Sequence, residues 1–158
     1  MDNDTGRFKV YDAERMCSWW GKSAITESAE ANYIINQMKA SQVWEDKYKV
    51  RTDLVVSFDP VPLADKSAYD GAFLCEGYIL NDEWIKGRRI VLAPTGRRLS
   101  VLLHELAHYV TFDYYPRAQI LNHGFNFLWF YCQLVRDFMG VDQAKELVVS
   151  LVKCGVKI

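Results

Sequence analysis

Hydrophobic and polar residues alternate with different periods along the chain, and the changes of period divide it into helical and extended stretches. Near the start, residues 10–20 favour a short helix that stops at Gly21. A second helix follows, with Thr26 as its expected cap. Its inner face is marked by hydrophobic residues three and four positions apart, namely Ala31, Ile34, Ile35 and Met38. We therefore predict two helices before the first strand.

From about residue 50 the helical spacing gives way to short runs rich in β-forming residues. Residues 53–58, 72–80 and 88–92 are typical of three strands. Two prolines predict a loop over residues 60–66, and a polar stretch predicts a turn over residues 81–87. We expect the three strands to form a small, mostly antiparallel sheet.

The remaining sequence is helical again. We predict a helix over residues 99–114, one over 123–138 capped by Asn122, and a last one capped by Asp142. Ala144, Leu147, Val148 and Leu151 are expected on the buried face of the last helix. Two helices, a small sheet and three further helices predict a single α+β domain over residues 1–158.

Composition narrows the class of protein. The chain has 158 residues, of which 50% are hydrophobic, so one domain can bury a core. A net charge of −1 provides no overall basic field for nucleic acid. With no signal peptide at the start and no apolar run of about 20 residues, we expect a cytoplasmic protein without membrane contact. Because no cysteines form a C-x-x-C pair, we expect free thiols at Cys17, Cys75, Cys132 and Cys154.

All three histidines of the chain fall in one stretch. The run His104-Glu105-Leu106-Ala107-His108 is followed by fourteen residues and then His123. A helix brings His104 and His108 to one face, where both can bind one divalent cation while Glu105 reaches a bound water. With His123 as third ligand, one coordination position stays open. We predict one Zn²⁺ per chain, while the sequence leaves manganese or iron open.

Other interpretations of these residues remain open. The motif can arise by chance on a surface helix, and His123 can simply begin the next helix. Asp113 and Asp137 are weaker candidates, either as ligands or as side chains that orient a histidine. The motif helix divides into a face toward a cleft, with Val101, His104, Glu105, His108 and Phe112, and a core face, with Leu103, Leu106, Ala107 and Val110.

If the site is an enzyme's, Glu105 takes a proton from the attacking water and passes it to a leaving amine. Tyr109, Tyr114 and Tyr115 are close enough in sequence to supply a phenol to the oxyanion, although packing is the better interpretation for each. We expect the substrate to be an extended peptide or protein segment added to a sheet edge.

The pattern H-E-L-A-H, fourteen residues and then H-G-x-x-F (His123, Gly124, Phe127) resembles the SprT-like metallopeptidases, which include the Spartan proteases. The resemblance covers residues 50–140 and implies a zincin-like fold. It implies that His104, His108 and His123 hold zinc and that Glu105 activates water for peptide hydrolysis. Residues 7–14 also resemble the start of a group of metallohydrolases encoded by actinobacteria and their phages.

The sequence departs from the SprT-like pattern in two respects, which weaken any expectation of nucleic-acid binding. The cysteine-based zinc ribbon is missing, and so is a basic extension. A local basic cluster remains, which we interpret as a solvated face: Lys86, Arg88, Arg89, Arg97 and Arg98. Three functions stay open: a zinc peptidase, a metallohydrolase acting on a non-peptide bond, and a zinc-stabilised module that binds protein or DNA without cleaving it.

Overall fold

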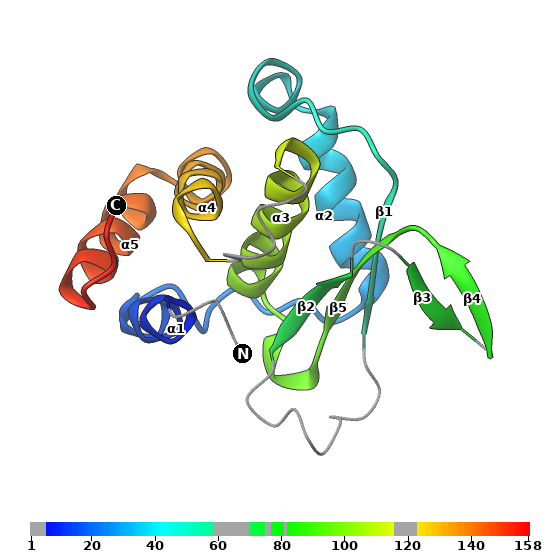
Figure 1. Ribbon diagram of the computed structural model, residues 1–158, viewed down its shortest axis with the longest axis horizontal. Coiled ribbons are helices and arrows are strands. Elements are labelled where there is room, and N and C mark those ends of the chain that lie inside the picture. Colours follow the sequence, from blue (N-terminus) through cyan, green and yellow to red (C-terminus); the bar gives the residue numbers. More distant parts are fainter. Residues whose placement is uncertain (1–5, 59–69, 75–76, 81, 116–122) are drawn as a thin grey trace.

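The computed structural model describes residues 6–58, 70–74, 77–80, 82–115 and 123–158 and has the predicted α+β architecture (Figure 1). Helices precede and follow a small sheet, in the expected order. None of the described helices is long and apolar enough to cross a membrane. The α-helices are α1 (Arg7–Met16), α2 (Ser28–Ala40), α3 (Leu99–Tyr114), α4 (Phe125–Phe138) and α5 (Val141–Lys153). A π-helical turn η1 (Trp44–Tyr48) and a 3-10 turn η3 (Pro94–Gly96) complete the helical elements.

The central sheet has three strands in the order β1 (Leu54–Phe58), β5 (Arg88–Leu92) and β2 (Gly71–Leu74). The β1–β5 pair is parallel and the β2–β5 pair is antiparallel, so the expectation of a mostly antiparallel sheet holds for only one of its two pairs. On its other side β1 is held by the Asn32 side chain of α2, which bonds the N–H and the C=O of Val56 at 2.9 and 2.8 Å.

The predicted second strand and the following turn are wrong in detail. Residues 72–80 supply two strands in different sheets, because β3 (Gly77–Leu80) pairs antiparallel with β4 (Glu83–Lys86) instead of with β5. The expected turn over residues 81–87 therefore contains a strand. Asp82 has a φ of 63°, a left-handed conformation that suits a tight hairpin turn.

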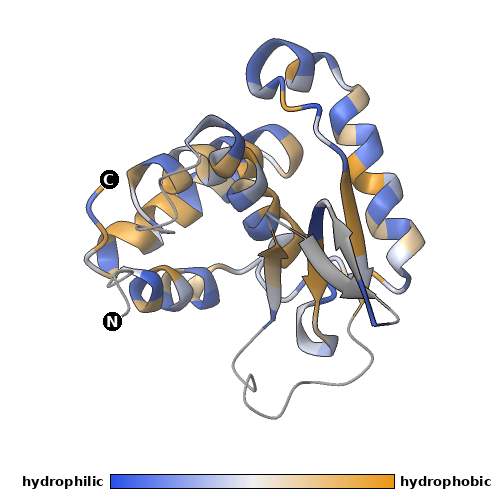
Figure 2. Ribbon diagram, turned by 45° about the vertical axis from the view of Figure 1, so that its right-hand side comes forward, coloured by the Kyte–Doolittle hydropathy of each residue, from blue (hydrophilic) through white to orange (hydrophobic). Residues whose placement is uncertain are grey.

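The helices lie in layers beside the sheet (Figure 1). Helix α3 packs across β2 and β5, α4 packs against α3, and α5 packs against both α4 and α1. Hydrophobic residues gather where helices and sheet meet (Figure 2). The largest fully buried side chains include Trp44, Tyr48, Tyr109, Tyr131, Phe127, Ile35, Ile90, Leu92, Leu102, Leu103, Leu106 and Leu134.

This layering corrects the predicted division of the motif helix into a core face and an open face. Because α3 lies between the sheet and α4, both of its faces are covered. His104 and Glu105 are only 4% and 6% exposed. The chemistry predicted for this helix is therefore located inside the protein.

Helix ends account for the remaining differences. Glu27, not Thr26, precedes α2, and the Thr26 hydroxyl instead donates to Glu30 Oε2 at 3.2 Å. Gly140, with a φ of 143°, stands at the cap position of α5, and Asp142 lies in its first turn. On α5, Val148 is 38% exposed, so it does not share the buried face of Ala144, Leu147 and Leu151. The predicted loop over residues 60–66 and the cap Asn122 lie outside the described residues.

Candidate metal centre

The three histidines predicted as ligands come together in the structure. His104 and His108 lie one turn apart on α3, and His123 stands two residues before α4. One ring nitrogen from each histidine lies within 4.8 Å of the others. The Nε2 atoms of His104 and His123 are 3.1 Å apart. This group can hold a metal ion.

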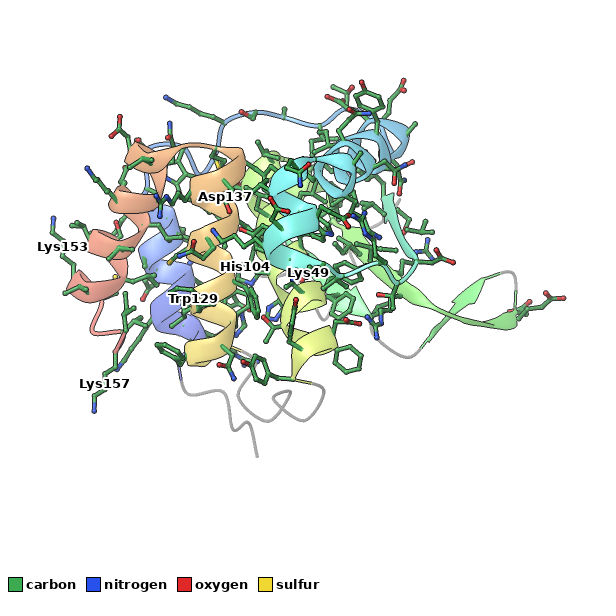
Figure 3. The ribbon with its side chains drawn as sticks, turned by 90° about the horizontal axis from the view of Figure 1, so that it is seen from above. Lys49, His104, Trp129, Asp137, Lys153 and Lys157 are labelled. Carbon is green, nitrogen blue, oxygen red and sulfur yellow. The ribbon has the colours of Figure 1, made fainter. Side chains whose placement is uncertain are left out.

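Helix α4 supplies the wall that fixes the imidazole rings. Phe127 stacks on His108, with ring centroids 4.3 Å apart and an angle of 25° between the planes. The same ring lies 5.0 Å from His104 and 4.9 Å from His123. His104 lies in the space between α3 and α4, away from exposed side chains of α4 such as Trp129 (Figure 3). The H-G-x-x-F segment therefore supplies both a histidine and the aromatic ring against which the histidines pack.

His108 is half-buried, whereas His104 and His123 are buried. The pKa of His108 lies well below its usual value, first because packing removes much of the side chain from water and second because His104 and His123 are close. A neutral imidazole has a free lone pair on one ring nitrogen, the form in which histidine binds metals.

Glu105 is buried beside the histidines, next to the start of β2. A Cβ placed on Gly71 would lie 3.2 Å from the Glu105 Cγ, so the absence of a side chain at residue 71 leaves room for the glutamate. Burial raises the pKa of Glu105 to about 8, and the charges of Glu14 and Asp70 act in the same direction. The sheet thus positions a carboxyl group with an unusually high proton affinity beside the histidines.

One further residue at the centre was not predicted from the sequence. Glu14 of α1 is 1% exposed, and its Oε1 is the hydrogen-bond partner of His104 Nδ1. The sequence did contain a signal for Glu14. Its position shares the spacing of a buried helix face with Val10, Ala13 and Cys17, so a carboxyl group interrupts an otherwise apolar stripe.

The aspartates proposed for this role lie elsewhere. Asp113 accepts a hydrogen bond from Arg88 at 2.6 Å, and Asp137 is bonded to Lys47 at 2.7 Å and to the Tyr48 hydroxyl at 2.6 Å. Both carboxylates thus connect α-helices to neighbouring elements, whereas the carboxylate seen to contact a histidine ring nitrogen is that of Glu14.

The tyrosines proposed as phenol donors have other roles. The Tyr109 hydroxyl donates to the Thr52 carbonyl, and the Tyr114 hydroxyl donates to the Tyr48 carbonyl at 2.6 Å. Tyr115 is 47% exposed at the end of α3. These contacts agree with the packing interpretation.

Two other tyrosines are the ones that contact the histidines. The Tyr11 ring of α1 lies 5.9 Å from the His104 ring and 5.3 Å from the His123 ring. The Tyr131 ring of α4 lies 5.3 Å from the His104 ring. Since Tyr11 and Glu14 are three residues apart on one helix, α1 contributes two side chains to the centre.

The basic cluster is not the solvated face that was expected. Arg88 forms an ion pair with Asp113, and Arg98 Nη2 lies 3.6 Å from Asp70 Oδ2. The Arg97 guanidinium lies 4.4 Å from the centre of the Phe58 ring. Each of these arginines is half-buried, and the Lys86 side chain lies outside the described part of the chain.

The predicted free thiols are confirmed at three positions, since Cys17, Cys132 and Cys154 form no disulfide. Cys75 lies beyond the described residues.

Comparison of the chain with protein-family models, with curated proteins and with solved structures gives no match.

Proposed function

We propose that this chain is a zinc-dependent peptidase in which His104, His108 and His123 hold the metal and Glu105 is the proton acceptor. The observation that carries the proposal is the meeting of three imidazoles with a buried glutamate on the same helix. A glutamate between two metal-binding histidines is not needed to hold the ion, so its burial beside them favours hydrolysis over a purely structural metal site. The resemblance to SprT-like metallopeptidases points the same way and is part of the proposal.

The donor set fits zinc. Three imidazoles leave one coordination position for water or substrate, as catalytic zinc requires. Nitrogen ligands lie about 2.0–2.1 Å from zinc, so two of them at the corners of a tetrahedron are about 3.3–3.4 Å apart. The separation of 3.1 Å between the Nε2 atoms of His104 and His123 is close to this value.

The chemistry assigned to the chain's own residues is proton transfer. When bound, zinc supplies a Lewis acid that polarises a carbonyl group and acidifies water. Glu105 accepts a proton from the attacking water and delivers it to the leaving nitrogen. Burial has two effects on this role: it makes the ionised Glu105 a stronger base, and it leaves only a minor fraction of the side chain ionised at pH 7, the fraction that can accept the proton.

The proposed substrate is an extended peptide segment. Among the described residues, β2 is paired on one side only, with β5. A Cβ placed on Gly71, at the start of β2, would lie 3.2 Å from the Glu105 Cγ, so a strand added along β2 would pass near the proton acceptor. Backbone hydrogen bonds would hold such a substrate with little dependence on its side chains.

The test combines metal content with hydrolysis. Elemental analysis of the purified protein is expected to give about one zinc ion per chain, and the His123→Ala variant is expected to lose it. Incubation with a mixture of peptides of known sequence, followed by mass spectrometry, then detects cleavage. Glu105→Gln is expected to keep zinc and abolish cleavage, while the exposed Glu83→Gln is the charge-matched control with unchanged activity.

The outcomes separate the three functions. Cleavage that survives in Glu105→Gln contradicts the proposed mechanism. Zinc binding with cleavage of esters but no peptides supports a metallohydrolase of another bond. Zinc binding without any hydrolysis supports a binding module, and a mobility shift with DNA at low salt then tests nucleic acid as its partner.

A further inference from the structure

Glu14 is an ionisable residue at a position where packing alone would favour an apolar one. It shares the inner face of α1 with Val10 and Ala13, both 0% exposed. Burying a carboxylate costs free energy unless a partner compensates it, and a well-packed hydrophobic residue at the same place is often at least as stable. His104, ninety residues later in the chain, is a partner of Glu14.

The two ring nitrogens of His104 face different neighbours. Nε2 faces the other histidines, 3.1 Å from Nε2 of His123, while Nδ1 contacts Oε1 of Glu14. A neutral imidazole has one N–H and one lone pair. For Nε2 to offer its lone pair to a cation, the proton must be on Nδ1, and a carboxylate is the acceptor that best stabilises it there.

We propose that Glu14 is a positioning residue of the metal centre, which accepts the Nδ1–H of His104 and thereby fixes the tautomer and orientation of that ligand. The inference deepens the proposed function and depends on it, since it assumes that the three histidines bind a metal. It makes α1 part of the metal centre, although the ligands come from α3 and from the residue pair before α4. Metal ligands commonly have such a carboxylate behind them, and its loss weakens metal binding about 10–100-fold.

Two variants test the charge and the hydrogen bond separately. Glu14→Gln keeps the side-chain volume and an oxygen that can accept the Nδ1–H, but removes the charge. Glu14→Ala removes both. We expect zinc affinity, measured by competition with a chromophoric chelator, to decrease from wild type to Gln to Ala, with a total loss of about 10–100-fold.

The matched control is Glu146→Gln. Glu146 of α5 accepts hydrogen bonds from the backbone N–H and the hydroxyl of Ser18, at 2.5 and 2.9 Å, and so holds the segment that follows α1. Because the hydrogen-bond partner of Glu146 is Ser18, this variant loosens the attachment of the same region and leaves the side chains of the three histidines and Glu14 in place. Zinc affinity of the control is expected to equal that of the wild type.

The readout specific to positioning is the visible absorption of the protein loaded with Co²⁺ in place of zinc. Glu14→Gln is expected to shift these bands, because they report the geometry and basicity of the ligands, whereas Glu146→Gln is expected to leave them unchanged. If Glu14→Ala does not fold, Glu14→Gln still decides the question, because glutamine fits the same space.

Three results overturn the assignment. The first is that Glu14→Gln binds zinc as tightly as the wild type and has an unchanged cobalt spectrum. Alternatively, Glu146→Gln loses as much affinity as Glu14→Gln, which would assign the effect to loosening of α1. In both cases wild-type zinc binding stands, so the proposed function is unaffected. Wild-type protein that binds no zinc overturns both proposals together.

Discussion

Replacement of Gly71 by alanine probes the contact between the sheet and the glutamate of the motif helix. The added methyl group would lie 3.0 Å from Val101 Cγ1, 3.2 Å from Glu105 Cγ and 3.3 Å from Leu92 Cδ2, all closer than ordinary contact. Val101 and Leu92 are 2% and 0% exposed, so neither can move into solvent. The displacement of a few tenths of an ångström therefore falls partly on Glu105.

Two opposing effects set the change in the free energy of unfolding that we expect for Gly71→Ala. Overpacking of a core costs about 1–3 kcal/mol. The reduced freedom of the unfolded chain on replacing Gly with Ala returns about 0.4–1 kcal/mol. We expect Gly71→Ala to lower the free energy of unfolding by about 1–2 kcal/mol. Since a misplacement of 1 Å can cost about 100-fold in rate, we also expect kcat/KM for peptide cleavage to decrease about 3–10-fold.

Two other glycines serve as controls in the same urea-unfolding assay. A Cβ on Gly21 has nothing within 4 Å, so Gly21→Ala is expected to be neutral or slightly stabilising. A Cβ on Gly96 would lie 1.9 Å from the backbone oxygen of Asp70, so Gly96→Ala requires backbone movement and is expected to cost more than about 4 kcal/mol. Equal stability of Gly71→Ala and Gly21→Ala, with unchanged kcat/KM, would refute the reasoning about the sheet contact.

Three further predictions concern the sheet edge, pH and metal. Asn32→Ala is expected to lose about 1–3 kcal/mol of unfolding free energy, because two hydrogen bonds to Val56 disappear; a loss below about 0.5 kcal/mol would contradict this. The bonds from Ser18 lower the pKa of Glu146, so their stabilisation is present above the usual value of 4.5 and is lost as pH falls through the lowered pKa. Glu146→Gln should accordingly melt below the wild type at neutral pH, with the gap closing in acid; a gap independent of pH argues against ionisation as its cause. Zinc at about 100 times its Kd should stabilise the wild type by about 2.7 kcal/mol and His123→Ala by far less, and equal stabilisation would argue against the ligand assignment.

The sequence allowed the metal centre to be predicted where the signal was local. His104 and His108 are one helical turn apart, so any helix through them places both rings together. His123 was predicted because it is the one remaining histidine and because it begins the H-G-x-x-F pattern, and its meeting with the others depends on how α4 packs against α3. The order of helices and sheet followed from changes in hydrophobic period, which are also local.

The long-range features could not be predicted in the same way. The contact of Glu14 with His104 joins residues ninety positions apart, and the two candidates nearer in sequence to the histidines, Asp113 and Asp137, pair with Arg88 and Lys47 instead. The sequence pattern could not predict the strand pairing either. The β-forming residues of β3 fit a partner in either sheet, and it is the turn at residue 82 that pairs them with β4.

The distance along the chain between Glu14 and its partners also sets the order in which the centre can be built. Helix α1 packs against α5, which ends at Lys153, about 140 residues after Glu14. At a synthesis rate of about 5–20 residues per second, α1 leaves the ribosome roughly 7–28 s before the end of α5 is made. During that interval α1 lacks the α5 surface against which it packs. The burial of Glu14 behind His104 is therefore complete only after the two ends of the described fold have met.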